Sequence, residues 1–461
     1  MSLGGWVITY LILTLAIGLA ASRLIHNSRD FLSANRSLPF FLSSFALFAL
    51  WFGSETVFGA SSEFIQHGVL GVIEDPFGGF LCLILFAAFF VRRLYRLNLL
   101  TLGDLFRKYY GPKVELLSSL FMLITFFGYV AAQLIALSIL FETVFGISSV
   151  SGLLLSAAIV TTYTAAGGMW AISITDFIQS IIIVIGLLLI AIDLSALVNL
   201  STLLDTPQPH FFDFFPNQNN EIRWIDYLAA WLTLGLGSLA SQDIFQRANA
   251  AKNEKTAVWS TYTGAGLYLL FALLPLYLGL LLLKIDPSLA AENTQQSLMD
   301  LVKSYAPFGL QVLFYGALIS AIFSTCSGAL LAPSTILSEN IIRPLFSEMS
   351  DRQFLILSRL SVIAIALVST WLAWGGTSIY ELVAQSSILG MVSILVPFMA
   401  ALFWKDNNQL AAVLSMILGL ISYVFAEFIY RTDFPPMFIG LFISMIGYLT
   451  GKLLVLAMEK G

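Results

Sequence analysis

Charged residues are scarce in this chain. Asp, Glu, Lys and Arg make up 11% of its 461 residues, whereas hydrophobic residues make up 58%. A soluble globular chain normally carries about 25% charged residues, so this composition excludes an ordinary soluble domain. The net charge is only −5 and no basic tail is present, so nothing in the sequence suggests nucleic-acid binding.

Cysteine and histidine are also rare. Cys82 and Cys326 both fall in apolar segments, so no disulfide framework is expected. His26, His67 and His210 stand in separate polar connections, with no Asp or Glu at catalytic spacing. The sequence therefore predicts neither an enzyme nor a zinc or redox-metal site.

Long apolar runs such as SIIIVIGLLLIAI recur along the whole chain, within segments of roughly 20 apolar residues that could cross a bilayer as helices. The first lacks a basic leading segment and a small-residue cleavage site, so it is interpreted as a retained helix. The pattern predicts an all-α polytopic membrane protein with thirteen transmembrane helices in a single membrane domain, 1–461. The predicted spans are 4–22, 38–65, 74–96, 114–143, 149–166, 170–197, 225–246, 256–283, 306–333, 354–374, 378–403, 408–430 and 434–456.

The basic residues support this division and give an orientation. Lys and Arg collect in cytoplasmic loops. With the N-terminus outside, only Arg223, Lys284, Lys303 and Arg431 of the 22 basic residues lie on the outer side. We therefore expect a protein of the cell membrane with its N-terminus outside and its C-terminus inside.

One charged stretch, WFGSETVFGASS at 51–62, lies inside the second span. An ionised carboxylate at the bilayer centre costs about 2.5–3.5 kcal/mol on insertion scales, so Glu55 should face a cavity or a partner. Gly53 and Gly59 bracket it, which suggests a break in the helix. A glutamate near a helix end that reaches the interface is the simpler explanation for the residue taken alone.

The seventh span is interrupted in the same way, by Gly235, Gly237 and neighbouring Ser and Gln residues. Two broken helices at corresponding places are typical of transporters built from inverted repeats, in which they flank the substrate and ion site. The predicted core is five-plus-five, with repeats at 38–197 and 225–403. An extra helix at 4–22 precedes it and two helices at 408–456 follow it.

The ninth span contains SAIFSTCSGALL, in which the carbonyl of Ala321 and the hydroxyls of Ser324 and Thr325 share one helix face. Oxygen-only ligands suit a hard cation such as Na⁺. Hydrogen bonds from these hydroxyls to the preceding turn are the plainer alternative. Asp176, in the first turns of the sixth span, could likewise complete a cation or proton site, or interact with the helix dipole.

Several blocks, in order along the chain, resemble the sodium/solute symporter family: DFLSANRSLPF, TLGDLFRKYYG, AAGGMWAISITDFIQ, FQRANAAKNEKTA and SAIFSTCSGALL followed by SENI. They cover most of the chain up to about residue 345. The stretch FALWFGSETVFGASSEF and its neighbours look closest to the choline-transporter branch of that family, which shares a tryptophan at the position of Trp51. The resemblance implies the five-plus-five fold and Na⁺-coupled uptake by alternating access, with Na⁺ as the coupling ion.

Carried over by position, the family's principal Na⁺ site maps to Phe48, Trp51, Ala321, Ser324 and Thr325. A further cation site found in some members maps to Asp176 and Ser327, but Gly328 stands where a second hydroxyl would be needed. The resemblance therefore implies one sodium site and puts the second in doubt.

The family's substrate-contacting positions map to residues of the two broken helices and the fourth span: Trp51, Ser54, Glu55, Tyr129, Gln133 and Gln242. Trp51, Phe52 and Tyr129 could present ring faces to a quaternary ammonium, with Glu55 balancing its charge. The choline branch has tryptophans at Tyr129 and Ser241, so that aromatic cage would be incomplete here.

The predicted function is Na⁺-coupled symport of a small organic solute, an organic cation, amino acid or zwitterion, into the cell. The main alternative is a proton-coupled symporter of a small carboxylate or amino acid, in which Glu55 or Asp176 titrates. A transporter-like sensor is a further alternative, as is a channel, although no charged ring or filter loop is visible. The expected partners are the small-molecule substrate and the lipid bilayer; the oligomeric state is left open.

Overall fold

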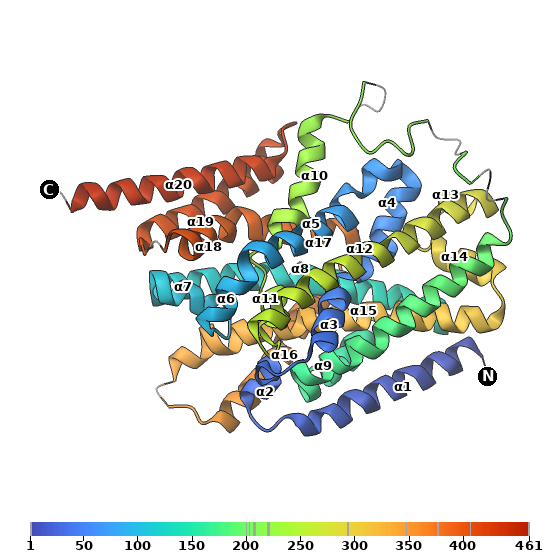
Figure 1. Cartoon of the computed structure of the whole chain (residues 1–461), viewed down its shortest axis with the longest axis horizontal. Coiled ribbons are helices and arrows are strands. Elements are labelled where there is room, and N and C mark those ends of the chain that lie inside the picture. The colour runs from blue at the N-terminus through green and yellow to red at the C-terminus, as the bar shows by residue number, and fades with distance from the viewer. Residues whose placement is uncertain are drawn as a thin grey trace.

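A computed structural model describes residues 2–199, 201, 203–205, 209–218, 222–292, 295–346, 348–375, 378–405 and 407–459. Within these ranges the protein is helical and has no β-strand (Figure 1). A single isolated bridge joins Leu38 and Ala251. The predicted all-α class is confirmed.

The α-helices of the described residues have the following bounds: α1 (Leu3–Ala21), α2 (Ser28–Ser33), α3 (Phe40–Trp51), α4 (Ala60–His67), α5 (Gly79–Leu85), α6 (Val91–Leu97), α7 (Leu102–Tyr110), α8 (Pro112–Phe145), α9 (Ser149–Ser195), α10 (Trp224–Gly237), α11 (Gln242–Asn249), α12 (Glu254–Ile285), α13 (Leu289–Glu292), α14 (Ser297–Tyr305), α15 (Phe308–Ile336), α16 (Asp351–Ala373), α17 (Ile379–Gly390), α18 (Val396–Met399), α19 (Gln409–Val424) and α20 (Pro436–Met458).

Short π-helical turns continue several of these helices: η3 (Glu55–Gly59), η5 (Ile73–Gly78), η6 (Phe86–Phe90), η8 (Leu337–Ile342), η10 (Met391–Leu395), η11 (Ala400–Trp404) and η12 (Phe425–Tyr430). Single 3₁₀ turns are η1 (Ser22–Leu24), η2 (Ala34–Arg36), η4 (Gly68–Val72) and η9 (Arg343–Leu345). Such π turns inside helices are frequent at functional sites, and η3 holds the charged stretch of the second predicted span.

Ten helices of the described residues are long and apolar enough to cross a membrane, by length and composition. α8, at 34 residues, is about 51 Å long and exceeds the hydrocarbon core of about 30 Å. α1 and α20 lie on opposite outer sides of the bundle in Figure 1, and the two chain ends lie at opposite ends of its long axis. These outer helices expose large apolar side chains, as helices that contact lipid do.

The residues of α9 form a helical hairpin. Gly168 has φ 49° and ψ −151°, which is not helical, and a Cβ at this position would lie 2.4 Å from the Phe31 carbonyl oxygen. The hydroxyls of Tyr163 and Thr175 hydrogen-bond to each other, although twelve residues of straight helix would separate them by about 18 Å. The chain therefore reverses at Gly168, between the spans predicted at 149–166 and 170–197.

The interruptions predicted in the second and seventh spans are present. α3 ends at Trp51, and Phe52 leaves the helix with φ −89° and ψ 67°. α10 ends at Gly237, and the chain passes through an extended Ser241 before α11 begins. The first break contacts α8 through Ser54 and Gln133, and the second contacts α17 through Ser238 and Ser387. Because α8 and α17 pack against each other, the two breaks border the same central region.

α15 is the innermost long helix, with every residue from Phe314 to Ile336 buried. It packs chiefly against α9, α8 and α16, and also contacts α11, α1 and α3. A helix that is apolar and buried on all sides presents polar side chains only where they have partners. The partners of its Ser and Thr hydroxyls therefore help to locate the functional site.

Candidate functional site

The broken helix meets α15 at Thr325. Its hydroxyl oxygen lies 2.9 Å from the Ala49 carbonyl oxygen and 3.2 Å from the Ala321 carbonyl oxygen. The backbone can approach this closely because Gly53 has no side chain; a Cβ there would lie 2.9 Å from Thr325 Oγ1. A carbonyl oxygen of α3 and one of α15 thus both lie within hydrogen-bonding distance of the same hydroxyl, and oxygens are the ligands that a hard cation prefers.

The other residues predicted for this sodium site include Phe48, Trp51 and Ser324, and each has a hydrogen-bond partner of its own. The Phe48 carbonyl accepts a hydrogen bond from Phe52 N at 3.1 Å, so at the end of α3 it is Ala49, one residue on, whose carbonyl faces Thr325. The Trp51 carbonyl oxygen lies 3.0 Å from the Thr56 hydroxyl. Ser324 donates to the carboxylate of Asp176.

Glu55 is buried and held by side chains of α8. Gln133 Nε2 donates to Glu55 Oε2 at 2.7 Å, and the other end of the same amide accepts from Ser54 N at 3.0 Å. The Tyr129 hydroxyl lies 3.4 Å from the second carboxylate oxygen. Gln133 therefore fixes the first turn after the break at two points, and the predicted cluster of Ser54, Glu55, Tyr129 and Gln133 comes together.

Thr56 anchors the other side of this turn. Its hydroxyl lies 3.0 Å from a carboxylate oxygen of the fully buried Asp75, which also accepts a hydrogen bond from Tyr268 on α12. Sequence reasoning missed Asp75. Asp75 lies at the start of the span predicted at 74–96, and only the folded chain brings it beside Thr56 and the break.

A cavity with an empty volume of about 660 Å³ lies between the two breaks. α3 with η3, α8, the α10–α11 break and α17 line it. Its polar lining includes two carboxylates, Glu55 and Asp243, and the hydroxyls of Tyr129 and several serines. The described lining contains no Lys, Arg or His, so its formal charge is negative.

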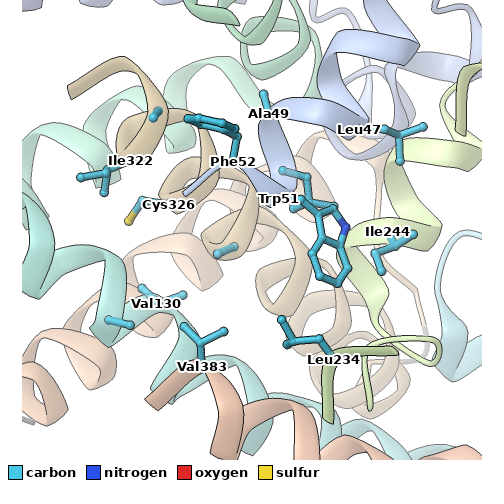
Figure 2. Close-up of a cluster of buried hydrophobic side chains, with 14 of the residues drawn as sticks. Leu47, Ala49, Trp51, Phe52, Val130, Leu234, Ile244, Ile322, Cys326 and Val383 are labelled. Atoms are coloured by element: carbon cyan, nitrogen blue, oxygen red, sulfur yellow. The ribbon is translucent and has the colours of Figure 1, made fainter. Parts of the chain in front are cut away.

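The indole of Trp51 also lines the cavity, and its Nε1 is buried without a hydrogen-bond partner in the described structure. Figure 2 shows the indole turned toward Leu234 and Ile244, whereas Phe52 points the other way, toward Ile322 and Cys326. Phe52 is therefore not part of the cavity wall. The sharp turn of the backbone after Trp51 separates the two rings.

Gln242, a predicted substrate position, faces away from the cavity, and one functional candidate was missed. Gln242 Oε1 accepts from Leu102 N at 2.8 Å, which fixes the turn before α7, so its side chain does not line the cavity. The next residue, Asp243, does; its carboxylate accepts from Ser241 Oγ at 2.5 Å. An acidic residue directly after a predicted helix break was the signal that could have identified it.

The positions suggested for a second cation are occupied differently. Asp176 forms a fully buried ion pair with Arg247, with 3.0 Å between Nη2 and Oδ2. Ser327 Oγ donates to the carbonyl of Ser324 in its own helix at 2.9 Å. The described residues contain no group of three or more His, Cys, Asp or Glu that could hold a metal ion.

The family model described as "Sodium:solute symporter family" matches residues 31–419. The chain belongs to the sodium:solute symporter family. The predicted resemblance is thus confirmed, as are the predictions of a transporter rather than an enzyme and of Na⁺ as the family's coupling ion. The family match also agrees with the predicted multi-pass membrane location.

Curated relatives include transporters of two named solutes. The osmoregulated proline transporter OpuE of Bacillus subtilis is 28% identical over 69% of this chain and 66% of its own length. A high-affinity choline transporter of Drosophila melanogaster is 24% identical over 90% of this chain and 69% of its own length. The match thus spans about two thirds of the length of these relatives.

Among solved structures, a Na⁺-coupled sialic acid symporter in a substrate-bound outward-open state superposes with a TM-score of 0.85 at 22% identity, covering 98% of both chains. A nucleobase-cation-symport-1 family transporter in a closed conformation gives a TM-score of 0.61 at 16% identity, covering 94% of this chain and 96% of its own. At these identities the likeness establishes a shared transporter fold.

Proposed function

We propose that this protein is a Na⁺-coupled symporter that carries a small organic cation or zwitterion into the cell by alternating access. The observation that carries the proposal is the cavity between the two helix breaks, which has two carboxylates and no basic side chain in its described lining. An amine or quaternary ammonium balances that charge, and Trp51 and Tyr129 add ring surface. A solute with only carboxylate groups would meet like charge.

In this proposal the substrate contacts Trp51, Glu55 and Tyr129, as predicted, and Asp243 in addition. Ser54 and Gln133 act one step away, because they hold Glu55 and the turn that carries it. The unpaired Nε1 of Trp51 suits a solute that also has a hydrogen-bond acceptor, such as the carboxylate of a zwitterion. The solutes named for the relatives fit the proposal: proline is a zwitterion and choline is a quaternary ammonium cation.

Na⁺ would bind where Thr325 and Ala321 of α15 face the end of α3, with Ser324 beside them and the carbonyls of Ala49, Phe48 and Trp51 as the α3 oxygens. A cation held by both helices stabilises the conformation in which they are together, and so orders the first turn of the broken helix around Glu55. The membrane potential adds about 2.3 kcal/mol per 100 mV for each charge carried inward.

The architecture proposed for this cycle is thirteen spans arranged as two inverted repeats of five, 38–197 and 225–403, with the N-terminus outside. The breaks after Trp51 and Gly237 each fall in the first helix of a repeat, and the reversal at Gly168 supports separate spans within α9. The two termini lie at opposite ends of the bundle, which suits an odd number of membrane crossings (Figure 1).

The test is the thermal stability of the purified protein in detergent with a panel of solutes, each in NaCl and in KCl. The panel comprises choline, glycine betaine, proline, other amino acids and small carboxylates. A ligand that binds the folded state raises its stability by mass action, by about 2.7 kcal/mol at a hundred times its Kd. We expect stabilisation by an ammonium-containing solute in NaCl only; stabilisation by a carboxylate that follows pH and not Na⁺ would support the proton-coupled alternative.

A further inference from the structure

Asp176 shares its buried carboxylate between two partners of different kinds. Oδ2 accepts from the guanidinium of Arg247 on α11 at 3.0 Å, and Oδ1 accepts from the hydroxyl of Ser324 on α15. The side chains of Arg247 and Asp176 are 2% and 0% exposed. A full positive charge is therefore fixed, inside the protein, at the carboxylate that the sequence suggested for a second cation.

Gly328 provides the space for that charge. A Cβ built on Gly328 would lie 2.4 Å from Nη1 and 2.6 Å from Nη2 of Arg247, closer than real side chains approach. Any other residue at this position would push the guanidinium away. The position that lacks the second hydroxyl ligand is thus the same position that makes room for the arginine.

The guanidinium depends on Asp176 for its charge balance. Within the described residues Nε and Nη1 of Arg247 have no hydrogen-bond partner. Removing one member of a buried ion pair leaves the other charge uncompensated, which is strongly unfavourable. A mobile cation bound at Asp176 would both compete for this carboxylate and lie against the fixed positive charge.

Ser324 connects this pair to the proposed sodium site. Because its proton is donated to Asp176, both lone pairs of its oxygen remain available to a cation on the other side. A carboxylate that orients a ligand from behind is a common arrangement at metal sites. Asp176 is therefore a positioning residue for the one sodium site and is not itself a ligand for another.

We propose that Arg247 is a resident cation that takes the place of a second coupling ion, with Gly328 as the residue that admits it, so that this transporter binds one Na⁺. The inference rests on the proposed function, since it presupposes the sodium site between α3 and α15. It adds a structural reason for a single ion, where the family resemblance only put a second one in doubt.

The experiment counts sodium sites by equilibrium binding of radiolabelled Na⁺ to the purified full-length protein, at constant ionic strength with KCl. We expect one site in the wild type. The double variant Arg247→Gln with Gly328→Ser removes the guanidinium and supplies a hydroxyl, and should gain a second site. Adding Asp176→Asn to the double variant should return the count to one.

Two variants serve as controls. Gly316→Ser places the same new hydroxyl on α15 where a Cβ meets no atom within 4 Å, and should keep one site. Arg247→Lys keeps a positive charge at the end of a flexible side chain, and should also keep one.

The outcomes separate the two proposals. Two sites in the wild type would overturn the resident cation and leave Na⁺ coupling intact, and this result needs no variant to fold. One site in both the wild type and a folded double variant would show that the ion pair only holds α11 to α9. No sodium binding in the wild type would overturn the proposed function itself.

Discussion

The backbone of Gly53 packs directly against the side chain of Thr325, and a Cβ on Gly53 would lie 2.9 Å from both Oγ1 and Cγ2 of that threonine. This contact places the break in the second span against the innermost helix of the bundle. It also brings the Ala49 carbonyl within 2.9 Å of the Thr325 hydroxyl, which lies 3.2 Å from the Ala321 carbonyl of its own helix. The glycine is therefore a condition for the sodium site and not only a helix breaker.

Gly53→Ala should separate the two helices and weaken Na⁺ binding. The added methyl group meets Thr325 and also Glu55 Oε2, at 2.7 Å, and overpacking of this kind costs about 1–3 kcal/mol. The rise in melting temperature between KCl and NaCl should fall to less than half. Gly266→Ala on α12, where a Cβ meets nothing within 4 Å, should leave that rise unchanged; equal losses in both variants would contradict the account.

Thr325→Val replaces the hydroxyl by a methyl group of similar shape. We expect the sodium affinity to fall about tenfold or more, which corresponds to about 1.4 kcal/mol, while stability in KCl changes less. Sodium titrations of the melting temperature measure this. The matched control is Ser334→Ala on the same helix, whose hydroxyl donates to Leu330 O within α15; a control that loses as much Na⁺ affinity would refute a specific role for Thr325.

Glu55→Gln and Asp243→Asn each remove one negative charge from the cavity. Both should weaken binding of an ammonium-containing solute by about 2 kcal/mol, or about thirtyfold. Binding isotherms in NaCl measure the loss. Asp226→Asn, which removes an exposed carboxylate paired with Arg223 in the first turn of α10, should leave solute binding unchanged. Tighter binding of the ammonium solute to either cavity variant would contradict the proposed chemistry.

Gln133→Leu should destabilise the protein in KCl as well as in NaCl. It leaves Ser54 N without its acceptor and Glu55 without its closest donor, and unsatisfied buried groups cost about 1–3 kcal/mol each. Thermal unfolding of the variant measures the loss. If solute affinity fell with stability intact, Gln133 would be a direct substrate contact instead of a support for Glu55.

Gly168→Ala should destabilise the hairpin of α9 without a specific effect on sodium. Its positive φ is strained for a residue with a side chain, at a cost of about 1–3 kcal/mol, and its Cβ would meet the Phe31 carbonyl. Melting temperatures in NaCl and KCl should fall by the same amount. A melting temperature equal to that of the wild type would mean that the chain does not reverse at this glycine.

Hydropathy and local residue types were enough to predict the helical class, the two interruptions and the turn at Gly168. Each of these depends on the sequence within one segment. The short helices in the polar connections were not predicted: α14 buries Leu298, Met299, Leu301 and Val302, but its apolar residues are too few to form a span. The packing partner that makes such a helix stable is distant in sequence.

The site was predictable where neighbours in sequence act together, and not where distant segments meet. Glu55 stood out because charge is costly within a span. Asp243 and Arg247 lie in a segment that resembled the polar end of a helix, so their roles depend on contacts with Ser241 and with Asp176. The side chain of Gln242 points toward α7, and the periodicity of one short helix was not enough to predict that direction.

The most direct test of a sodium site between α3 and α15 is the melting temperature of the purified, solute-free protein as Na⁺ replaces K⁺ at constant ionic strength, in the wild type and in Ser324→Ala. We predict a saturable rise with Na⁺ in the wild type and little or none in the variant, at a pH that is held constant. A wild type that is insensitive to Na⁺, or a Ser324→Ala variant that responds as strongly as the wild type, would contradict the account.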